Sequence, residues 1–175
     1  MDSDLIPVSI DSIRVSLVSP HRIVVLKDSD ERFLPIWIGP YEADAINIAL
    51  QGNQVARPLT HDLLKAIIQQ VGGTPSHIAV IDLREDTFYA QIVIQLNDKR
   101  VELDSRPSDA IALAVRLQIP IYVADEVMDK ASIRPSQNTE SAAPEEDEQL
   151  DAFRDLIEDL DLDGLGKGGD SPKVE

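Results

Sequence analysis

The sequence predicts an α+β domain, in which a mixed, mainly antiparallel β-sheet packs against three main helices, plus a disordered acidic C-terminal tail. Short segments with the two-residue periodicity of strands recur between residues 8 and 124, and longer segments with helical periodicity interrupt them. Apolar residues make up 43% of the chain and aromatic residues only 4%, so the core must be aliphatic. Beyond residue 134 the chain becomes polar and acidic, which is typical of disorder.

Seven segments have the pattern of strands and are separated by turn-forming residues. They are residues 8–17, 22–28, 33–39, 77–85, 87–96, 100–104 and 121–124. The first segment changes phase near Asp11–Ser12, which indicates an irregularity in that strand. We expect a hairpin around Glu85–Asp86 and a turn at Asn97–Asp98.

Three helices fit between these strands, and a short fourth helix closes the domain. They are expected at Tyr41–Leu50, His61–Val71, Pro107–Leu117 and Asp125–Ala131. The second is amphipathic and ends at Gly72–Gly73, because glycine readily terminates a helix. The third is apolar on almost every side, which predicts a position between layers of the domain.

The domain is expected to span residues 1–134, with three further segments after it. Residues 135–147 are a predicted disordered linker, 148–163 a short acidic amphipathic helix, and 164–175 a disordered tail. Residues 1–134 carry 13 Lys and Arg against 19 Asp and Glu, a net charge of −6. Residues 135–175 carry 3 against 13, a net charge of −10, so the acidic tail is a candidate for binding a protein partner.

The composition excludes several classes of function. The chain has no Cys, which excludes disulfides, thiolate chemistry and Cys-based zinc sites. No signal peptide is visible and the longest apolar runs are far too short to cross a membrane, so a cytoplasmic protein without a membrane partner is expected. The net charge of −16 repels phosphate backbones at long range, so binding of nucleic acid would require a local basic cluster.

Three predicted helices begin with similar chemistry. Pro40 and Pro107 suit the first helical position, which places Glu42 and Asp109 near the third position, facing the free N–H groups. The remaining helix has Thr60 as a plausible N-cap and an acid, Asp62, close behind it. These acids either cap their helices or hold a site.

Two arginines precede prolines at these helix starts. Arg57 and Arg106 gain nothing from a helix N-terminus, so each either pairs with the neighbouring acid or holds an anion there. The three histidines include no pair at helical spacing, which argues against a zinc site. Mg²⁺ or Mn²⁺ needs only one or two carboxylates, which Glu42, Asp62, Asp104 and Asp109 can supply, so the identity of any metal stays open.

Three stretches resemble the bifunctional nuclease domain family: "FLPIWIGPYEADAI", "ARPLTHDLL" and "LDSRPSDAIALAVR", in this order. The similarity extends over residues 5–134, the whole predicted domain. The resemblance implies a compact α+β domain that self-associates as a homo-oligomer, and it implies hydrolysis of RNA and DNA, the activity that gave the family its name.

Two functions are compatible with these residues. The first is a nuclease that hydrolyses phosphodiester bonds of DNA or RNA, with metal assistance where a cation binds. Its candidate catalytic residues are Asp62, Asp109, His61 and Glu42, and its candidate phosphate-binding residues are Arg57, Arg106 and Ser108. The alternative is a non-catalytic, oligomeric regulatory or assembly domain, for which the nearly all-apolar helices would form a rigid core.

Overall fold

A computed structural model of the chain describes residues 5–15, 21–52 and 55–134. The chain divides into two units, Met1–Pro135 and Ser136–Glu175, and the first contains every element described below. The expected linker (135–147), acidic helix (148–163) and C-terminal tail (164–175) lie outside the described residues.

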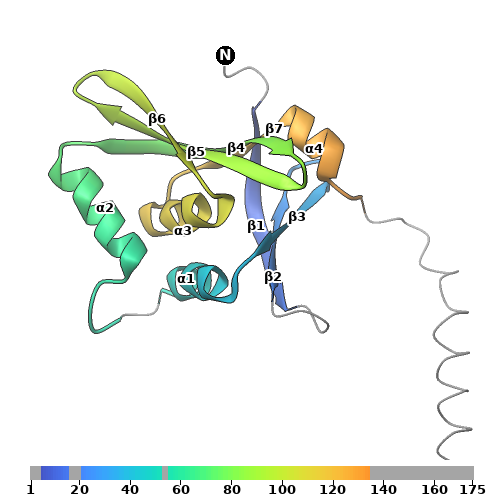
Figure 1. The fold of residues 1–175 in the computed structure, drawn as a ribbon, viewed down its shortest axis with the longest axis horizontal. Coiled ribbons are helices and arrows are strands. Elements are labelled where there is room, and N and C mark those ends of the chain that lie inside the picture. Colours follow the sequence, from blue (N-terminus) through green and yellow to red (C-terminus); the bar gives the residue numbers. More distant parts are fainter. Residues whose placement is uncertain (1–4, 16–20, 53–54, 135–175) are drawn as a thin grey trace, which may run out of the picture. The chain divides into compact units, whose positions relative to one another are not determined.

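The described residues form the predicted α+β fold, a seven-stranded mixed sheet with four helices (Figure 1). The strands are β1 (Leu5–Val15), β2 (Arg22–Lys27), β3 (Phe33–Ile38), β4 (Thr74–Arg84), β5 (Thr87–Leu96), β6 (Lys99–Ser105) and β7 (Ile121–Ala124). The helices are α1 (Pro40–Leu50), α2 (Thr60–Gln70), α3 (Pro107–Leu117) and α4 (Asp125–Ala131). Each predicted strand and helix is confirmed to within a few residues at its ends.

Strand β1 joins the two halves of the sheet, whose strand order is β3-β2-β1-β7-β4-β5-β6. Its first residues, Leu5–Val8, pair with β7, whereas Ser9–Val15 pair with β2. The register shifts between Ile10 and Ser12, where the sequence predicted a change of phase. Neighbouring strands are antiparallel except β4 and β7, which are parallel. In Figure 1, β1 and β2 run at a steep angle to β4 and β5.

Two tight turns connect β4, β5 and β6. Both central residues of each turn, Glu85–Asp86 and Asn97–Asp98, have positive φ angles between 46° and 60°. This is the type I′ geometry, whose twist matches that of the flanking strands. The predicted hairpin and turn are therefore confirmed.

Helix α3 occupies the centre of the domain. Pro107, Ser108 and all residues from Ala110 to Ala114 are buried, and the helix packs against α1, α2, β4 and β5. It thus lies between the sheet and the other two helices, as its apolar composition predicted (Figure 1). Helix α2 ends as predicted: Gly72 has φ +81°, and the N–H of Gly73 donates to Ile68 O at 2.8 Å.

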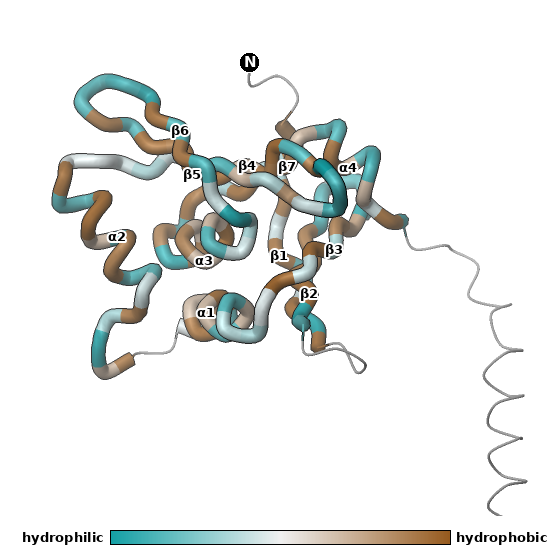
Figure 2. Tube along the Cα trace, in the orientation of Figure 1, coloured by the Kyte–Doolittle hydropathy of each residue, from teal (hydrophilic) through white to brown (hydrophobic). Residues whose placement is uncertain are grey.

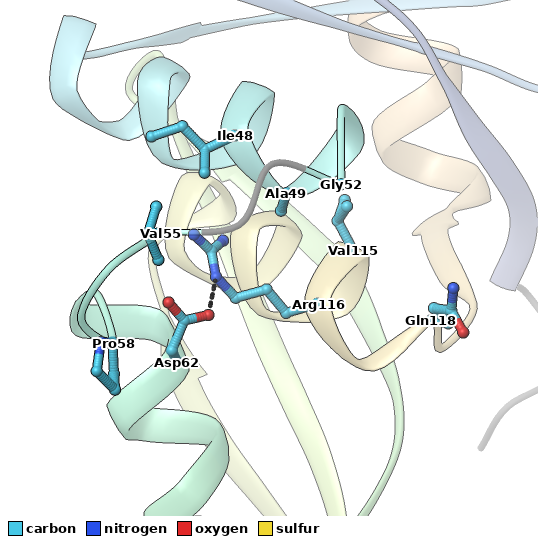
Figure 3. Close-up of a pocket in the computed structure, with 9 residues that line it drawn as sticks. All are labelled: Ile48, Ala49, Gly52, Val55, Pro58, Asp62, Val115, Arg116 and Gln118. Carbon is cyan, nitrogen blue, oxygen red and sulfur yellow. Dashed lines mark hydrogen bonds and ion pairs between the residues drawn. The ribbon is translucent and has the colours of Figure 1, made fainter.

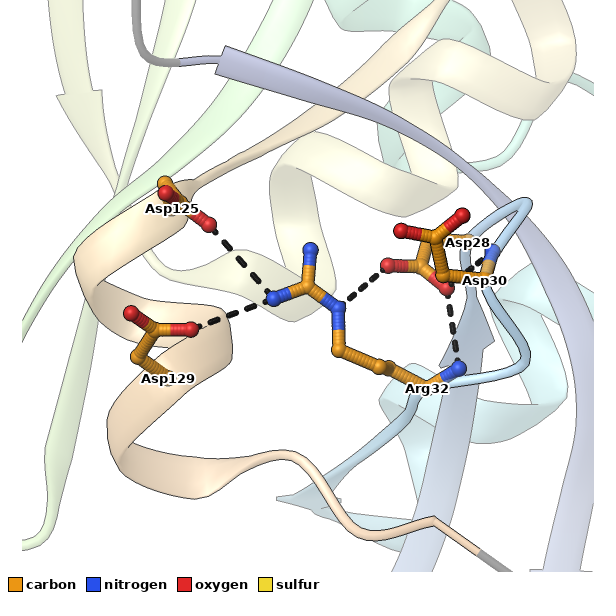
Figure 4. Close-up of polar contacts among 5 residues, drawn as sticks. All are labelled: Asp28, Asp30, Arg32, Asp125 and Asp129. Atoms are coloured by element: carbon orange, nitrogen blue, oxygen red, sulfur yellow. Dashed lines mark hydrogen bonds and ion pairs between the residues drawn. The ribbon is translucent and has the colours of Figure 1, made fainter.

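Arg32 links the β2–β3 turn to α4 (Figure 4). Its Nε donates to Asp28 Oδ2 at 2.6 Å, and its Nη1 lies 3.2 Å from Asp129 Oδ1 and 3.5 Å from Asp125 Oδ1. Asp28 Oδ1 also accepts the backbone N–H groups of Asp30 and Arg32, both at 2.9 Å. The Asp28 side chain is only 1% exposed, and these bonds satisfy its buried carboxylate.

The core is aliphatic, as the composition predicted, and it runs from the inner faces of β2 and β3 to α3 and β4. Its fully buried side chains include Leu26, Leu34, Ile36, Ile46, Ile78, Ile111, Leu113 and Met128. No helix in the described part of the chain is long and apolar enough to span a membrane. Figure 2 shows apolar residues along the length of α2.

Candidate active site at three helix N-termini

The starts of α1 and α3 have the geometry that the sequence predicts. Pro40 and Pro107 are the first helical residues, with Gly39 and Arg106 as the N-cap residues, so Glu42 and Asp109 lie in the first turn. The predicted Thr60 cap of α2 was wrong. Thr60 is already helical, the N-cap residue is Leu59, and Asp62 Oδ2 accepts the Leu59 N–H at 2.8 Å.

Four of the predicted site residues meet where α1, α2 and α3 begin. We call Glu42, His61, Arg106 and Asp109 the helix-start cluster. Arg106 holds it together, because its Nε donates to Asp109 Oδ2 at 2.8 Å and its Nη2 to Asp109 Oδ1 at 3.2 Å. Its Nη1 donates to Glu42 Oε1 at 3.0 Å. The ion-pair reading of Arg106 is therefore correct, and the pair reaches a second helix.

Arg106 keeps donors for a ligand although it is paired. A guanidinium group has five N–H donors, and the bonds to Asp109 and Glu42 use three of them. The side chain is 66% exposed, so the remaining donors face solvent-accessible space. The two carboxylates thus hold the guanidinium in one orientation without saturating it.

His61 and Asp109 form a pair that bridges α2 and α3. The distance from His61 Nε2 to Asp109 Oδ1 is 3.2 Å, and the His61 side chain is only 12% exposed. An ionised carboxylate can only accept, so Nε2 carries the proton and the lone pair of neutral His61 lies on Nδ1. This arrangement of a carboxylate behind an imidazole is common among general acid–base catalysts.

Electrostatics keep Asp109 ionised. Burial raises the pKa of Asp109, but hydrogen bonds from Arg106 and then from His61 outweigh it, so the pKa lies below the ordinary value of 3.8. The same bond to Asp109 raises the pKa of Arg106 above its ordinary value. Both members of this pair therefore carry full charge at neutral pH.

Gly39 leaves room for the Glu42 carboxylate. A Cβ atom built on Gly39 would overlap Glu42 Oε2, so the carboxylate occupies the space that any other residue would fill. The φ angle of Gly39 is −71°, which every residue type adopts, so space rather than backbone conformation requires glycine here.

Two pockets flank the helix-start cluster and share Glu42 and Arg106. The helix pocket, of about 560 Å³, is lined by Tyr41, Glu42, Asp44, Ala45, Ile48, Pro58, Leu59, Thr60, His61, Arg106 and Asp109. The strand pocket, of about 260 Å³, is lined by Ile36, Trp37, Ile38, Gly39, Glu42, Asp86, Thr87, Phe88, Arg106, Pro107 and Ser108. The helix pocket falls within the usual size range of small-molecule sites.

Asp62 faces a different pocket, of about 530 Å³, where it pairs with Arg116 (Figure 3). Arg116 Nε donates to Asp62 Oδ1 at 2.8 Å, and the Arg116 side chain is only 6% exposed. Burial raises the pKa of Asp62, but the hydrogen bonds from the Leu59 N–H and from Arg116 outweigh this effect, so the pKa lies below the ordinary value of 3.8. Both carboxylate oxygens are engaged, so Asp62 ties α2 to α3. Asp62 therefore lines another pocket than Arg106 and Asp109, although Ile48 and Pro58 line both pockets.

The remaining predicted residues lie at the edges of the cluster. Ser108 is buried at 6% exposure and lines the strand pocket with Arg106. Arg57 is exposed, and within the described residues its side chain forms no hydrogen bond or ion pair. Its neighbour Pro58 lines the helix pocket, so Arg57 lies beside this pocket rather than inside it.

No group of three or more His, Asp or Glu side chains in residues 5–15, 21–52 and 55–134 is arranged to hold a metal ion. Glu42 and Asp109 lie on opposite sides of the Arg106 guanidinium, and both bind it. This arrangement fits a hydrated Mg²⁺ or Mn²⁺ that takes a single carboxylate, but not one ion bound by both.

Sequence reasoning missed two aromatic residues at the site. Trp37 lines the strand pocket and is 58% exposed, and Tyr41 lines the helix pocket and is 84% exposed. The signal was present, because Trp37 alternates with the buried Ile36 and Ile38 and therefore had to lie on the outer face of β3.

Comparisons with known proteins identify the family. The sequence profile described as "Bifunctional nuclease domain" matches residues 24–136. An uncharacterized protein of Mycobacterium tuberculosis is 36% identical over 160 residues, which cover 89% of this chain and 95% of that protein. Bifunctional nuclease 2 of Arabidopsis thaliana is 31% identical over 110 residues, and Bifunctional nuclease 1 of Oryza sativa subsp. indica is 24% identical over 147 residues.

The matched region covers 60% and 81% of this chain but only 33% and 44% of these two plant proteins. The profile match includes all four residues of the helix-start cluster and most of the described domain. The chain belongs to the bifunctional nuclease domain family.

Proposed function

We propose that the domain hydrolyses phosphodiester bonds of DNA or RNA at the helix-start cluster. The observation that carries this proposal is the convergence of three helix N-termini on a paired His61, Asp109 and Arg106. Helix N-termini favour anions, and a positioned arginine binds phosphate oxygens through parallel N–H groups. The family name and the names of the plant relatives support the same chemistry.

Each residue of the cluster has a distinct role in this proposal. His61 exchanges protons with the attacking water or the leaving oxygen through Nδ1, while Asp109 fixes its orientation and stabilises its protonated form. The free donors of Arg106 bind the phosphate and stabilise the negative charge of the transition state. Glu42 holds Arg106 from the opposite side.

Metal assistance is a further part of the proposal. A Mg²⁺ or Mn²⁺ ion would be held by one of these carboxylates, Glu42 or Asp109, and would supply a bound water as the nucleophile. Ser108 and Arg57 are proposed as additional phosphate contacts, one from the strand pocket and one beside the helix pocket. Asp62 is proposed to be structural.

The test is cleavage of end-labelled single-stranded RNA and DNA, with Mg²⁺, with Mn²⁺ and with EDTA. The proposal expects cleavage by the wild type, a loss of about 100-fold or more in His61→Ala, and a similar loss in Arg106→Lys, which keeps the charge but not the forked donors. Arg14→Ala is the matched control, because Arg14 is exposed, lines neither pocket and pairs with its neighbours Asp11 and Ser12. Absence of cleavage by folded wild type in all three conditions would refute the proposal.

One observation favours a second function, assembly with further copies of the chain. Leu63 and Ile67 lie on the outer side of α2, and Val71, the residue that follows the helix, continues their four-residue spacing; the three side chains are 56%, 51% and 60% exposed. Such a stripe is typical of a helix that packs against a partner, and we propose that this partner is a second copy.

Sedimentation velocity tests this second function. Ile67→Asp is expected to dissociate the oligomer, whereas Gln69→Asp, an exposed residue on the opposite side of the same helix, leaves it intact. A monomeric wild type at every concentration tested would rule out self-association through α2.

A further inference from the structure

Exposed aromatic side chains occur at one place in the described domain. Of the Phe, Tyr and Trp residues in 5–15, 21–52 and 55–134, only Trp37 and Tyr41 are exposed. The others are Phe33, Phe88, Tyr89 and Tyr122, all of which are half-buried. The described surface is therefore poor in aromatic side chains, and its two exposed rings are concentrated at this place.

Both rings flank the helix-start cluster. Trp37 lines the strand pocket and Tyr41 the helix pocket, and these two pockets meet at Glu42 and Arg106. The local fold causes this placement. Strand β3 turns Trp37 outward, Gly39 and Pro40 start α1 immediately afterwards, and Tyr41 follows in its first turn.

The combination of exposed rings and a partly free arginine matches one chemical class of ligand. Unpaired bases stack on aromatic side chains, and the phosphates between them bind cations such as arginine. In a duplex the faces of the bases are hidden inside the stack, so exposed aromatic rings cannot stack on them. Acidic residues dominate this domain, so phosphate contacts alone would give weak binding and stacking must contribute.

We propose that Trp37 and Tyr41 form a stacking platform that makes the site selective for single-stranded nucleic acid. This inference rests on the proposed nuclease function and adds the form of the substrate. One base stacks on Trp37 above the strand pocket and another on Tyr41 above the helix pocket. The phosphate between the two stacked bases is thereby held next to Arg106 and His61.

Intrinsic fluorescence tests the platform directly, because Trp37 is the only tryptophan in the chain. The probe is an oligothymidylate of about 12 nucleotides, a length typical of single-strand sites, added alone or annealed to its complement. Gel analysis after each titration shows whether the probe stays uncut. The proposal expects saturable quenching by the single strand and none by the duplex at equal concentration.

Variants separate stacking from general effects on the surface. Binding of a fluorescently labelled probe, followed by anisotropy, is expected to weaken about tenfold in Trp37→Ala and in Tyr41→Ala. Trp37→Phe and Tyr41→Phe keep an aromatic face and are expected to bind nearly as well as the wild type. Leu103→Ala removes an exposed apolar side chain that lines neither pocket and should have no effect.

The outcomes distinguish this inference from the proposed function. Quenching by an uncut single strand supports the platform even where no hydrolysis follows, whereas hydrolysis with full activity in both alanine variants overturns the platform and leaves the nuclease intact. Equal quenching by duplex and single strand also overturns it. If neither the single strand nor the duplex binds, the platform is overturned and the two rings belong to another surface, such as a protein interface, where Trp and Tyr are also common.

Discussion

Asp109 Oδ1 lies 3.2 Å from His61 Nε2, although the two residues are 48 positions apart and belong to different helices. The contact exists because α1, α2 and α3 begin at the same place in the fold. It converts three ordinary helix starts into one group of paired side chains. Each helix contributes at least one charged or titratable residue to this group.

Acidification should destabilise the protein as the paired aspartates lose their charge. Burial raises the pKa of Asp28 and that of Asp109, but the hydrogen bonds that each carboxylate accepts outweigh burial, so both pKa values lie below 3.8. Because the folded pKa is lower than the unfolded one, this stabilisation is fully present above about pH 4. It is lost as the pH falls through the folded pKa.

Chemical unfolding followed between pH 7 and pH 3 is the measurement. Asp28→Asn should lower the free energy of unfolding at neutral pH by about 2–3 kcal/mol, because it removes a charged partner of Arg32. Asp28→Asn should also make the free energy of unfolding decline less steeply as the pH falls. The exposed Asp44→Asn is the control, and a decline in Asp28→Asn as steep as in the wild type would contradict the assignment.

Gly39→Ala should displace Glu42 and impair the site without breaking α1. The added Cβ overlaps the Glu42 carboxylate, so Glu42 must leave Arg106. A misplaced clamp can reduce kcat/KM by up to about 100-fold. In a Glu42→Ala background the space is already empty, so adding Gly39→Ala should have no further effect. Equal losses in both backgrounds would mean that the glycine acts in another way.

Arg57→Ala should weaken binding of nucleic acid without changing the chemical step. Arg57 is exposed and lies beside the helix pocket, so its expected role is one phosphate contact. Removing one such contact should reduce the slope of log affinity against log salt by about 1. Anisotropy at several salt concentrations measures this slope, and an unchanged slope would remove Arg57 from the binding surface.

Deletion of residues 135–175 should raise the affinity for nucleic acid. These residues carry a net charge of −10, and a tethered acidic segment competes with phosphate at high effective concentration. The gain should shrink as salt rises, because exposed charges are screened beyond about 10 Å near 0.1 M. The same deletion should leave the melting temperature almost unchanged. A large fall would mean that the deleted residues stabilise the domain.

The elements of the fold were predictable because local patterns specify them. The phase change in β1, the turns at Glu85–Asp86 and Asn97–Asp98, and the buried position of α3 all followed from periodicity or turn chemistry. The N-cap residue of α2 was not predictable, because Leu59 has no side-chain acceptor. The third-position Asp62 satisfies the N-terminus of α2 instead.

The partners of the site residues were beyond sequence reasoning, because they depend on how the helices pack. Arg106 reaches Glu42 across 64 positions, and Asp62 turns to Arg116 across 54. Nothing in the local sequence separates Asp62 from Asp109, since each occupies the first turn of its helix. The two aspartates differ because Asp62 forms an ion pair with the buried Arg116 of α3, and this pair holds its carboxylate outside the helix-start cluster.

These two aspartates provide the most direct test of the central claim, that the helix-start cluster is the catalytic site. Each lies in the first turn of a helix, each binds an arginine at 2.8 Å, and the pKa of each is lowered. The measurement is the rate of cleavage of labelled single-stranded nucleic acid by Asp109→Asn and Asp62→Asn, with folding checked by circular dichroism. The account predicts a loss of about 100-fold or more in Asp109→Asn and a rate near that of the wild type in Asp62→Asn. Equal loss in both variants, or full activity in Asp109→Asn, would contradict it.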